Sequence, residues 1–160
     1  ATDRFIFEGF LADKQTARRK QMQALAGEPR SLGFYEAPHR ILAFVQDCVA
    51  IFGEGRQACI ARELSKYYET IKTDTLANLL SWLEADENQR KGEFVIVVQG
   101  SDEIFEDGEE EAIRVLKILL QGHPVKQAST LAAEITGLKK NALYKLALDL
   151  HKQNQGDQST

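Results

Sequence analysis

Two short segments place ionisable side chains directly after apolar runs that are typical of strands. Residues 34–40 read Phe-Tyr-Glu-Ala-Pro-His-Arg, and residues 61–66 read Ala-Arg-Glu-Leu-Ser-Lys. Together they supply carboxylates, an imidazole and guanidinium groups, which are able to transfer protons or hold anions. Ligands of α/β folds bind at the carboxyl ends of strands, so two such segments in one sheet favour a cleft. A purely structural junction between strand and helix is the alternative interpretation.

The known sequence motifs of complete active sites are missing. The chain has no G-x-G-x-x-G loop, no G-x-x-x-x-G-K-[ST] loop, no Cys/His spacing for a metal, and no Ser/His/Asp set that spacing singles out. We therefore expect no metal site. If the protein is an enzyme, we expect part of its site to lie outside this chain.

The first hundred residues alternate strand-like and helix-like segments, which predicts an α/β layer structure. Thr75 is an expected helix cap, and the continuous apolar run at 94–98 is typical of a central strand covered on both faces. The predicted strands span residues 5–10, 32–35, 58–61, 67–72 and 94–98. The predicted helices span residues 14–26 and 39–53, with a third one after Thr75.

Charge divides the chain into three parts. Residues 1–100 are nearly neutral, residues 101–111 hold seven acids and no base, and residues 112–160 hold seven bases and three acids. This pattern predicts an α/β domain over 1–100, an acidic linker over 101–111 and a helical domain over 112–153. The polar tail at 154–160 is expected to be disordered. Downstream of the linker, helices are predicted over 110–120, 126–136 and 139–152.

The last two predicted helices have the spacing of a helix-turn-helix. Ala133 and Gly137 supply a small contact residue and a turn glycine, and Leu143 and Leu146 supply the apolar face of the second helix. A plain αα-hairpin used for packing is the alternative interpretation. Basic residues on or next to the second helix favour nucleic-acid binding, since phosphate neutralisation needs such charge.

A second basic stretch lies in the helix predicted over 14–26. Arg18 and Arg19 stand there between Lys14 and Lys20, with few large apolar residues beside them. A solvated helix face is one interpretation. A surface that contacts phosphates is the other.

Composition excludes several classes of protein. The chain has 160 residues, of which 43% are hydrophobic and 28% charged, so disordered, collagenous and disulfide-scaffold chains are excluded. No apolar run reaches the ~18 residues of a membrane span, and residues 1–4 do not begin a secretory leader. Cys48 and Cys59 lie in apolar contexts and are expected to be buried free thiols. Together these features predict a cytoplasmic protein without a membrane partner.

Four ordered motifs resemble one enzyme family. They are Thr2 to Leu11, with Thr-Asp-Arg-Phe and Phe-Glu-Gly-Phe-Leu, then residues 34–40, residues 61–66, and Gly-Glu-Phe-Val at 92–95 followed by Gly100. The set is similar to the small-subunit rRNA methyltransferases of the tetrapyrrole methylase, or class III, superfamily. The resemblance implies a mixed β-sheet flanked by helices, the second of two α/β domains, followed by a small all-α helix-turn-helix domain. It also implies that a first domain with a Gly-rich cofactor loop precedes this chain.

The resemblance implies S-adenosylmethionine as cofactor and 2′-O-methylation of a cytidine in 16S rRNA near the decoding centre of the assembled small subunit. In-line methyl transfer requires alignment of the acceptor oxygen, methyl carbon and sulfur, and removal of the hydroxyl proton. Glu36, His39 and Glu63 are the catalytic candidates. Much of the cofactor contact is expected through backbone atoms. The implied cofactor contacts are Tyr35, Glu36, Ala37, Glu63, Leu64, Ser65, Glu93 and Phe94. The RNA-binding candidates are Arg18, Arg19, Arg40, Arg62, Lys66, Lys139, Lys140 and Lys145.

Two other functions fit parts of the sequence. The basic helix-turn-helix also suits an RNA-binding module without catalysis. A superfamily relative acting on a small molecule such as a tetrapyrrole is the third possibility, although such a substrate gives no reason for a basic helical extension. The resemblance further implies that the full-length protein is a homodimer and that this chain alone folds but does not methylate.

Overall fold

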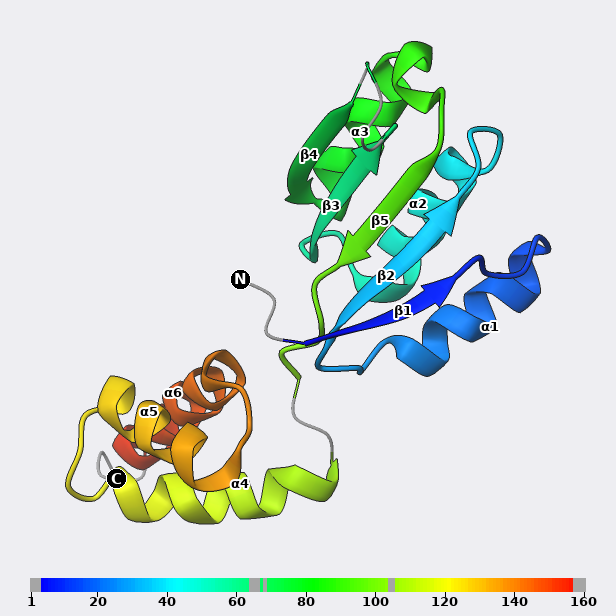
Figure 1. The fold of residues 1–160 in the computed structure, drawn as a ribbon. Coiled ribbons are helices and arrows are strands. Elements are labelled where there is room, and N and C mark those ends of the chain that lie inside the picture. Colours follow the sequence, from blue (N-terminus) through cyan, green and yellow to red (C-terminus); the bar gives the residue numbers. More distant parts are fainter. Residues whose placement is uncertain (1–3, 64–66, 68, 104–105, 157–160) are drawn as a thin grey trace. The chain divides into compact units, whose positions relative to one another are not determined.

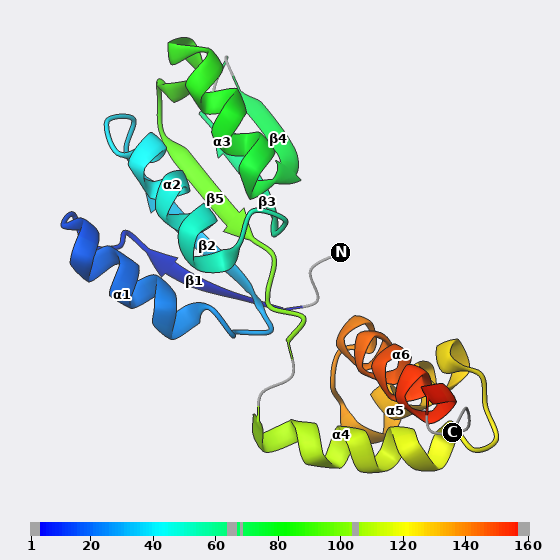
Figure 2. The ribbon, with the colours of Figure 1, turned by 180° about the vertical axis from the view of Figure 1, so that it is seen from behind.

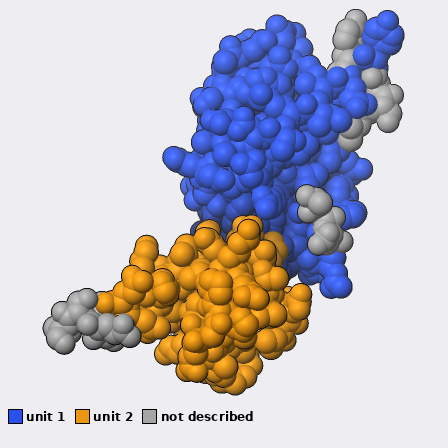
Figure 3. All heavy atoms as spheres, turned by 90° about the vertical axis from the view of Figure 1, so that its left-hand side faces the viewer, with its two compact units in different colours: residues 1–101 blue, residues 102–160 orange. Residues whose placement is uncertain are grey.

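The chain forms two compact units, residues 1–101 and 102–160, each with its own hydrophobic core (Figure 1 and Figure 3). The structure is a computed structural model that describes residues 4–63, 67, 69–103 and 106–156. The first unit is a mixed sheet flanked by helices and the second is entirely helical, which confirms the predicted fold class.

The first unit holds a five-stranded sheet in the order β1-β2-β5-β3-β4. β1 and β2 are parallel, and β5 pairs antiparallel with both β2 and β3, while β4 pairs antiparallel with β3. The strands are β1 (Phe5–Gly9), β2 (Ser31–Glu36), β3 (Gln57–Arg62), β4 (Thr70–Thr75) and β5 (Phe94–Val98). The helices are α1 (Gln15–Leu25), α2 (Ile41–Phe52), α3 (Leu76–Ala85) and the 3-10 turn η1 (Glu87–Arg90).

All three α-helices of this unit cover the same face of the sheet, which faces the viewer in Figure 2. Alternate strand residues therefore point into the core: on β5, Phe94, Ile96 and Val98 are buried, whereas Val95 and Val97 are half-buried. The central position predicted for this strand is confirmed. The predicted cover on both faces is wrong, because the described helices all pack on one side.

The start of α3 follows from its sequence. The hydroxyl of Thr75 accepts a hydrogen bond from the Asn78 N–H at 3.2 Å, as predicted for an N-cap. Leu76, Leu79 and Leu83 then recur on one face and are fully buried. The same core includes Cys48, whose thiol has a raised pKa because it is buried. Both cysteines are free, and Cys59 is only half-buried, contrary to expectation.

The second unit consists of α4 (Glu106–Leu119), α5 (Val125–Thr136) and α6 (Lys140–Gly156). Gly137 ends α5 at a φ of 73°, a conformation that favours glycine, and its N–H donates to the Ala133 carbonyl at 2.9 Å. Leu143 is buried against α5, as the helix-turn-helix spacing predicts. Ala133 is only half-buried, and the fully buried small residues of α5 are Ala128, Ser129 and Ala132.

Two predicted boundaries in this unit are wrong. The acidic residues 106–111 form the first turns of α4 instead of a linker, because acids are favourable at a helix start. Residues 154–156 continue α6 instead of belonging to the tail predicted over 154–160, and residues 157–160 lie outside the described part of the chain. None of the helices in the described residues is long and apolar enough to cross a membrane.

Candidate functional site

Three segments that are distant in sequence meet at one edge of the sheet. β5 lies between β2 and β3 and runs opposite to both, so the carboxyl ends of β2 and β3 flank the beginning of β5. In the register, Phe94 is opposite Glu36 on one side and opposite Arg62 on the other. We call this edge, with residues 35–37, 62–63 and 92–94, the strand-end site. The structure thus brings together the described parts of the predicted site segments.

Glu63 holds the β3 side of the strand-end site to the β5 side. Its N–H donates to the Glu93 carbonyl at 2.9 Å, and its carboxylate Oε1 accepts from the Glu93 N–H at 2.6 Å. The backbone of Glu63 has a φ of 53°, which side-chain-bearing residues rarely adopt. Gly92 is required beside it, because a Cβ there would collide with the Glu63 carboxylate. Glu63 therefore acts in this structure as a positioning group.

Glu36 ends β2 with a buried carboxylate. Its side chain is only 1% exposed, and Oε1 accepts from the Ala37 N–H at 2.8 Å and lies 3.0 Å from Nε of Arg40. Burial raises the pKa of Glu36, and the Ala37 hydrogen bond and the charges of Arg18 and His39 oppose that rise. The Ala37 N–H and the Arg40 guanidinium thus hold the Glu36 carboxylate in place at the strand-end site.

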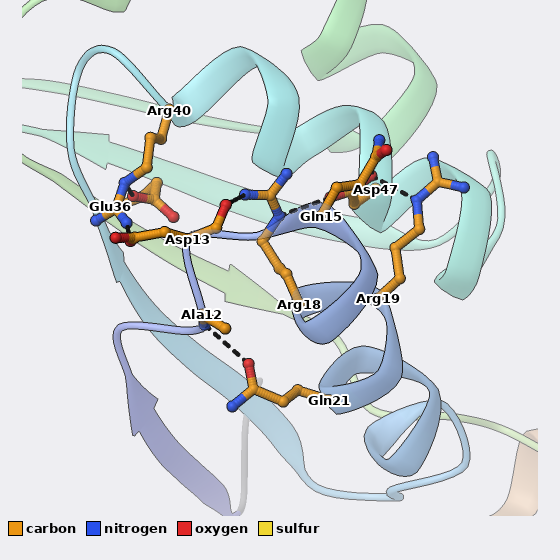
Figure 4. A network of polar contacts seen from close by, with 9 residues as sticks. All are labelled: Ala12, Asp13, Gln15, Arg18, Arg19, Gln21, Glu36, Arg40 and Asp47. Carbon is orange, nitrogen blue, oxygen red and sulfur yellow. Dashed lines mark hydrogen bonds and ion pairs between the residues drawn. The ribbon is translucent and has the colours of Figure 1, made fainter.

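Arg40 joins Glu36 to the loop before α1. In Figure 4 its guanidinium lies between the carboxylates of Glu36 and Asp13, with which it forms ion pairs. The Arg40 side chain is 21% exposed, and its guanidinium is already paired with both carboxylates. This placement makes Arg40 a link between β2 and the loop after β1.

Arg18 and Arg19 converge on Asp47 of α2 (Figure 4). Their Nε atoms lie 2.6 and 2.7 Å from the two oxygens of a fully buried carboxylate, and Gln15 donates to it at 3.2 Å. The guanidinium of Arg18 is 4% exposed, so both the solvated face and the RNA contact predicted for it are wrong. Arg19 is 42% exposed and is also held by Asp47. Helix α1 has few large apolar residues beside Arg18 and Arg19 because these two side chains form ion pairs with Asp47 of α2.

Tyr35 and Phe94 lie on opposite faces of the sheet. Tyr35 is 44% exposed on the face without helices, where its ring centroid lies 4.7 Å from that of Phe7 and 5.6 Å from that of Phe10. Phe94 is buried in the core beneath the helices. A ligand at this edge is able to contact the Tyr35 ring, but it reaches Phe94 only through the backbone.

His39 is exposed and lines a hollow of about 440 Å³ between the start of α2 and η1. Arg62 lies close to η1: its guanidinium donates to the Asn88 carbonyl, and Nη2 donates to the Thr70 hydroxyl at 3.1 Å. This side chain therefore ties β3 to β4 and η1. The predicted contacts Leu64, Ser65 and Lys66 lie outside the described residues.

Two of the three predicted RNA-binding lysines of the second unit are exposed. Lys140 and Lys145 project from α6 into solvent, whereas Lys139 is half-buried and lies 3.8 Å from the Asp102 carboxylate. Among the described residues, no group of three or more His, Cys, Asp or Glu side chains is placed to hold a metal ion.

Sequence reasoning missed the basic pair Arg90 and Lys91, which line the same hollow as His39. A signal for them exists: they stand immediately before the Gly92-Glu93 turn that opens a predicted strand. The role of Asp47 had no such signal, because its two arginine partners are 28 and 29 residues away in the sequence.

Comparison with known proteins gives strong matches along the chain. Residues 106–151 match the family model described as the RsmI C-terminal HTH domain. "Ribosomal RNA small subunit methyltransferase I" of Escherichia coli O157:H7 is 49% identical over 92% of this chain and 52% of that protein. The same-named protein of Pseudomonas aeruginosa PAO1 is 51% identical over 97% of this chain and 54% of that protein. The chain spans about half the length of these curated relatives.

Among solved structures, the cobalt precorrin-4 methyltransferase CbiF is 14% identical and covers 61% of this chain and 41% of its own, with a TM-score of 0.46. The sequence matches are far stronger, and they extend across both units. Residues 106–151 thus match the model of the RsmI C-terminal HTH domain, and most of the chain is similar in sequence to about half of ribosomal RNA small subunit methyltransferase I.

Proposed function

We propose that this chain is part of an S-adenosylmethionine-dependent methyltransferase that modifies the rRNA of the small ribosomal subunit in the cytoplasm. The observation that carries the proposal is the strand-end site, where Glu36, Phe94 and Arg62 stand side by side in neighbouring strands. The names of the relatives, which are 49% and 51% identical to this chain over about half of their own length, supply the substrate class.

The residues present suit the proposed cofactor. S-adenosylmethionine carries a cationic sulfonium, and in the strand-end site the three carboxylates of Glu36, Glu63 and Glu93 outnumber the one base, Arg62, which favours a cation. When bound, the cofactor supplies an electrophilic methyl group.

The three catalytic candidates separate by their surroundings. The carboxylates of Glu36 and Glu63 each accept a backbone N–H, so we assign them to positioning. His39 is exposed beside the site, so we assign it the role of accepting the proton of the attacking hydroxyl. The two hydrogen bonds between Glu63 and Glu93 keep the beginning of β5 in register with the end of β3.

The test is methyl transfer by the full-length protein. With purified small subunits and radiolabelled S-adenosylmethionine, His39→Gln should lower kcat by 100-fold or more while leaving cofactor affinity within twofold. His151→Gln, an exposed histidine on α6, is the matched control and should keep full activity. Unchanged kcat in His39→Gln would remove it from the mechanism, and absence of methylation by the wild-type protein would reject the proposed function.

The finer specificity is also a proposal: the acceptor is a cytidine 2′-hydroxyl of 16S rRNA near the decoding centre. Nuclease digestion of the methylated rRNA followed by mass spectrometry identifies the modified nucleoside. A 2′-O-methylcytidine is the expected product, and a base-methylated product would contradict it. We further propose that the 160-residue chain alone binds rRNA but does not methylate it, and turnover by this chain alone would contradict that statement.

Binding of rRNA by the second unit is a separate candidate function. Lys140 and Lys145 are exposed on the second helix of a helix-turn-helix, which is where phosphate contacts are expected. The triple variant Lys139→Gln, Lys140→Gln and Lys145→Gln should weaken rRNA binding at least tenfold and flatten its salt dependence. Unchanged binding in the triple variant would exclude this surface.

We also propose that the full-length protein is a homodimer that covers the helix-free face of the sheet with a second copy. Strand positions on this face in the described residues hold no Asp, Glu, Lys or Arg, so two identical faces do not repel. The exposed parts of its four aromatics amount to about 450 Å², a large share of the ~800 Å² per partner in a standard interface. Its large exposed side chains are Phe5, Phe7, Phe10, Tyr35 and Ile71.

Light scattering coupled to gel filtration tests the dimer. The double variant Phe5→Lys and Ile71→Lys should halve the measured mass. The matched control is Ile118→Lys with Ile135→Lys, which changes two equally exposed isoleucines in the second unit and should leave the dimer intact. A wild-type monomer, or a dimer that survives Phe5→Lys with Ile71→Lys, would contradict this interface.

A further inference from the structure

Next to the strand-end site lies an open groove, of whose lining the catalytic assignment above uses only His39. It is the hollow of about 440 Å³ between α2 and η1, within the size range of small-ligand sites. Pro38, Leu42 and Ala43 give it an apolar wall on the α2 side. Arg90 and Lys91 form the wall on the η1 side.

The groove adjoins the site through the chain itself. Pro38 and His39 follow Glu36 by two and three residues, and Lys91 precedes Glu93 by two. Glu36 and Phe94 are opposite each other in the register of β2 and β5, so each wall of the groove begins within a few residues of the strand-end site. A polymer that places one of its units at the site is able to place the neighbouring unit in this groove.

The charges of the η1 wall suit an anion. Arg90 and Lys91 are cationic, and the one acid in the lining, Glu87, is 90% exposed and lies 3.6 Å from the Arg90 guanidinium. The Arg90 side chain is 26% exposed and its Nη2 lies 3.6 Å from the Glu87 carboxylate, beyond hydrogen-bond distance, so the guanidinium keeps donor capacity toward the groove. A guanidinium with free donors beside an apolar wall suits a phosphate next to a base.

The η1 wall is fixed before any ligand arrives. The Asp86 carboxylate accepts from the Asn88 N–H at 2.9 Å and so begins the 3-10 turn. The guanidinium of Arg62 donates to the Asn88 carbonyl from the neighbouring strand. Lys91 donates to the Asn88 side chain at 2.9 Å. These bonds hold the two cations at one place relative to β3 and β5.

We propose that this groove binds the nucleotide of single-stranded RNA that adjoins the methylated one. Its phosphate lies against Arg90 and Lys91, and its base packs on Pro38 and Leu42 beside His39. The inference rests on the proposed function for the identity of the polymer, and it adds the place where that polymer is held. It assigns to Arg90 and Lys91 a role in substrate positioning.

Binding is measured with the 160-residue chain, in a background that carries Lys139→Gln, Lys140→Gln and Lys145→Gln to remove the second unit's contribution. The probe is a fluorescent 12-nucleotide single-stranded RNA. Adding Arg90→Gln and Lys91→Gln should weaken binding at least tenfold. The slope of log K against log salt should fall by about 1.4, the value for two lost phosphate contacts on a single strand.

The matched control is Arg30→Gln with Arg56→Gln. These residues immediately precede β2 and β3, so they lie at the opposite edge of the sheet and remove the same charge. The control should bind within twofold of the background. Equal weakening in the control and in the Arg90/Lys91 variant would overturn the proposal, because it would show only a general effect of charge.

Nuclear magnetic resonance with cytidine 5′-monophosphate locates the contact independently of affinity. Chemical-shift changes at the amides of His39, Leu42, Ala43 and Lys91 are expected. Changes confined to other residues would overturn the proposed binding in the groove. In the full-length protein, Arg90→Gln with Lys91→Gln should raise KM for the small subunit with kcat kept. If the wild-type protein does not methylate but the groove shifts appear, the proposed function fails and the groove stands.

Discussion

Two buried carboxylates of the first unit show how partners decide ionisation. Glu36 and Asp47 are both nearly inaccessible to solvent. Burial raises the pKa of Glu36, because the Ala37 hydrogen bond and the charges of Arg18 and His39 only partly offset the lost hydration. Burial alone would also raise the pKa of Asp47, but the hydrogen bonds from Arg19, Arg18 and Gln15 outweigh it and lower the pKa.

Asp47→Asn should lower the free energy of unfolding by about 3–5 kcal/mol, because it leaves the guanidinium of Arg18 buried without its counter-charge. Urea denaturation of the 160-residue chain measures the change. Asp149→Asn, at an exposed position of α6, is the control and should stay within about 0.5 kcal/mol. A loss of less than 1 kcal/mol for Asp47→Asn would show that the cluster contributes little.

The two carboxylates should also give opposite pH dependences. The folded pKa of Asp47 is below its unfolded value, so its contribution is complete above about pH 4 and is lost as the pH falls through the folded pKa. The folded pKa of Glu36 is above its unfolded value. Its ionisation therefore weakens the fold as the pH rises from the unfolded pKa through the folded pKa. Denaturation midpoints from pH 3 to 7 for Asp47→Asn and Glu36→Gln should therefore change relative to wild type in opposite directions.

At the scale of elements, turns and caps were predictable from single residues. Thr75 and Gly137 were identified from the sequence because a side-chain cap and a positive φ each depend on one residue type. The start of α4 was missed because a run of acids is equally typical of a linker and of a first helical turn. The two-sided cover expected for β5 failed because an apolar run does not reveal which face the helices take.

Gly137→Ala should destabilise the second unit by about 1 kcal/mol, since alanine pays the cost of the positive φ that the α5 C-cap requires. Gly122→Ala is the control: a Cβ there meets open space and the φ is not in the positive range. It should be neutral or slightly stabilising. Thermal unfolding followed by far-ultraviolet circular dichroism compares the two variants, and equal effects would contradict the special role of Gly137.

At the scale of the molecule, the division into two units agrees with a separate core in each. The order and type of the elements were predictable, because hydrophobic periodicity is local. The meeting of Glu36, Glu63 and Glu93 at one edge depended on strand order, which no local pattern encodes. The two charged strand ends with Glu36 and Glu63 favoured a cleft, but only the family resemblance added Glu93. The groove that Arg90 and Lys91 line could not be predicted for the same reason, since its other wall is about 50 residues away.

Residues 1–101 and residues 102–160 should each fold alone, because neither core borrows a buried residue from the other. Cooperative unfolding of each piece in urea, with midpoints close to those in the intact chain, is the expected result. Residues 1–92, which lack β5, form the negative control and should not fold cooperatively. A cooperative transition in that control would show that β5 is dispensable for the sheet.

The position of β5 also sets an order of events during synthesis. β2 and β3 leave the ribosome before β5, yet in the finished sheet they are separated by it and never pair with each other. Until residues 94–98 emerge, both strands present unsatisfied backbone edges, which are templates for aggregation. Insertion of the last strand closes these edges and creates the strand-end site in a single step. The nascent chain is therefore most vulnerable to aggregation just before residue 94, and a chaperone that holds it at that point would act on the same two strand edges that later pair with β5.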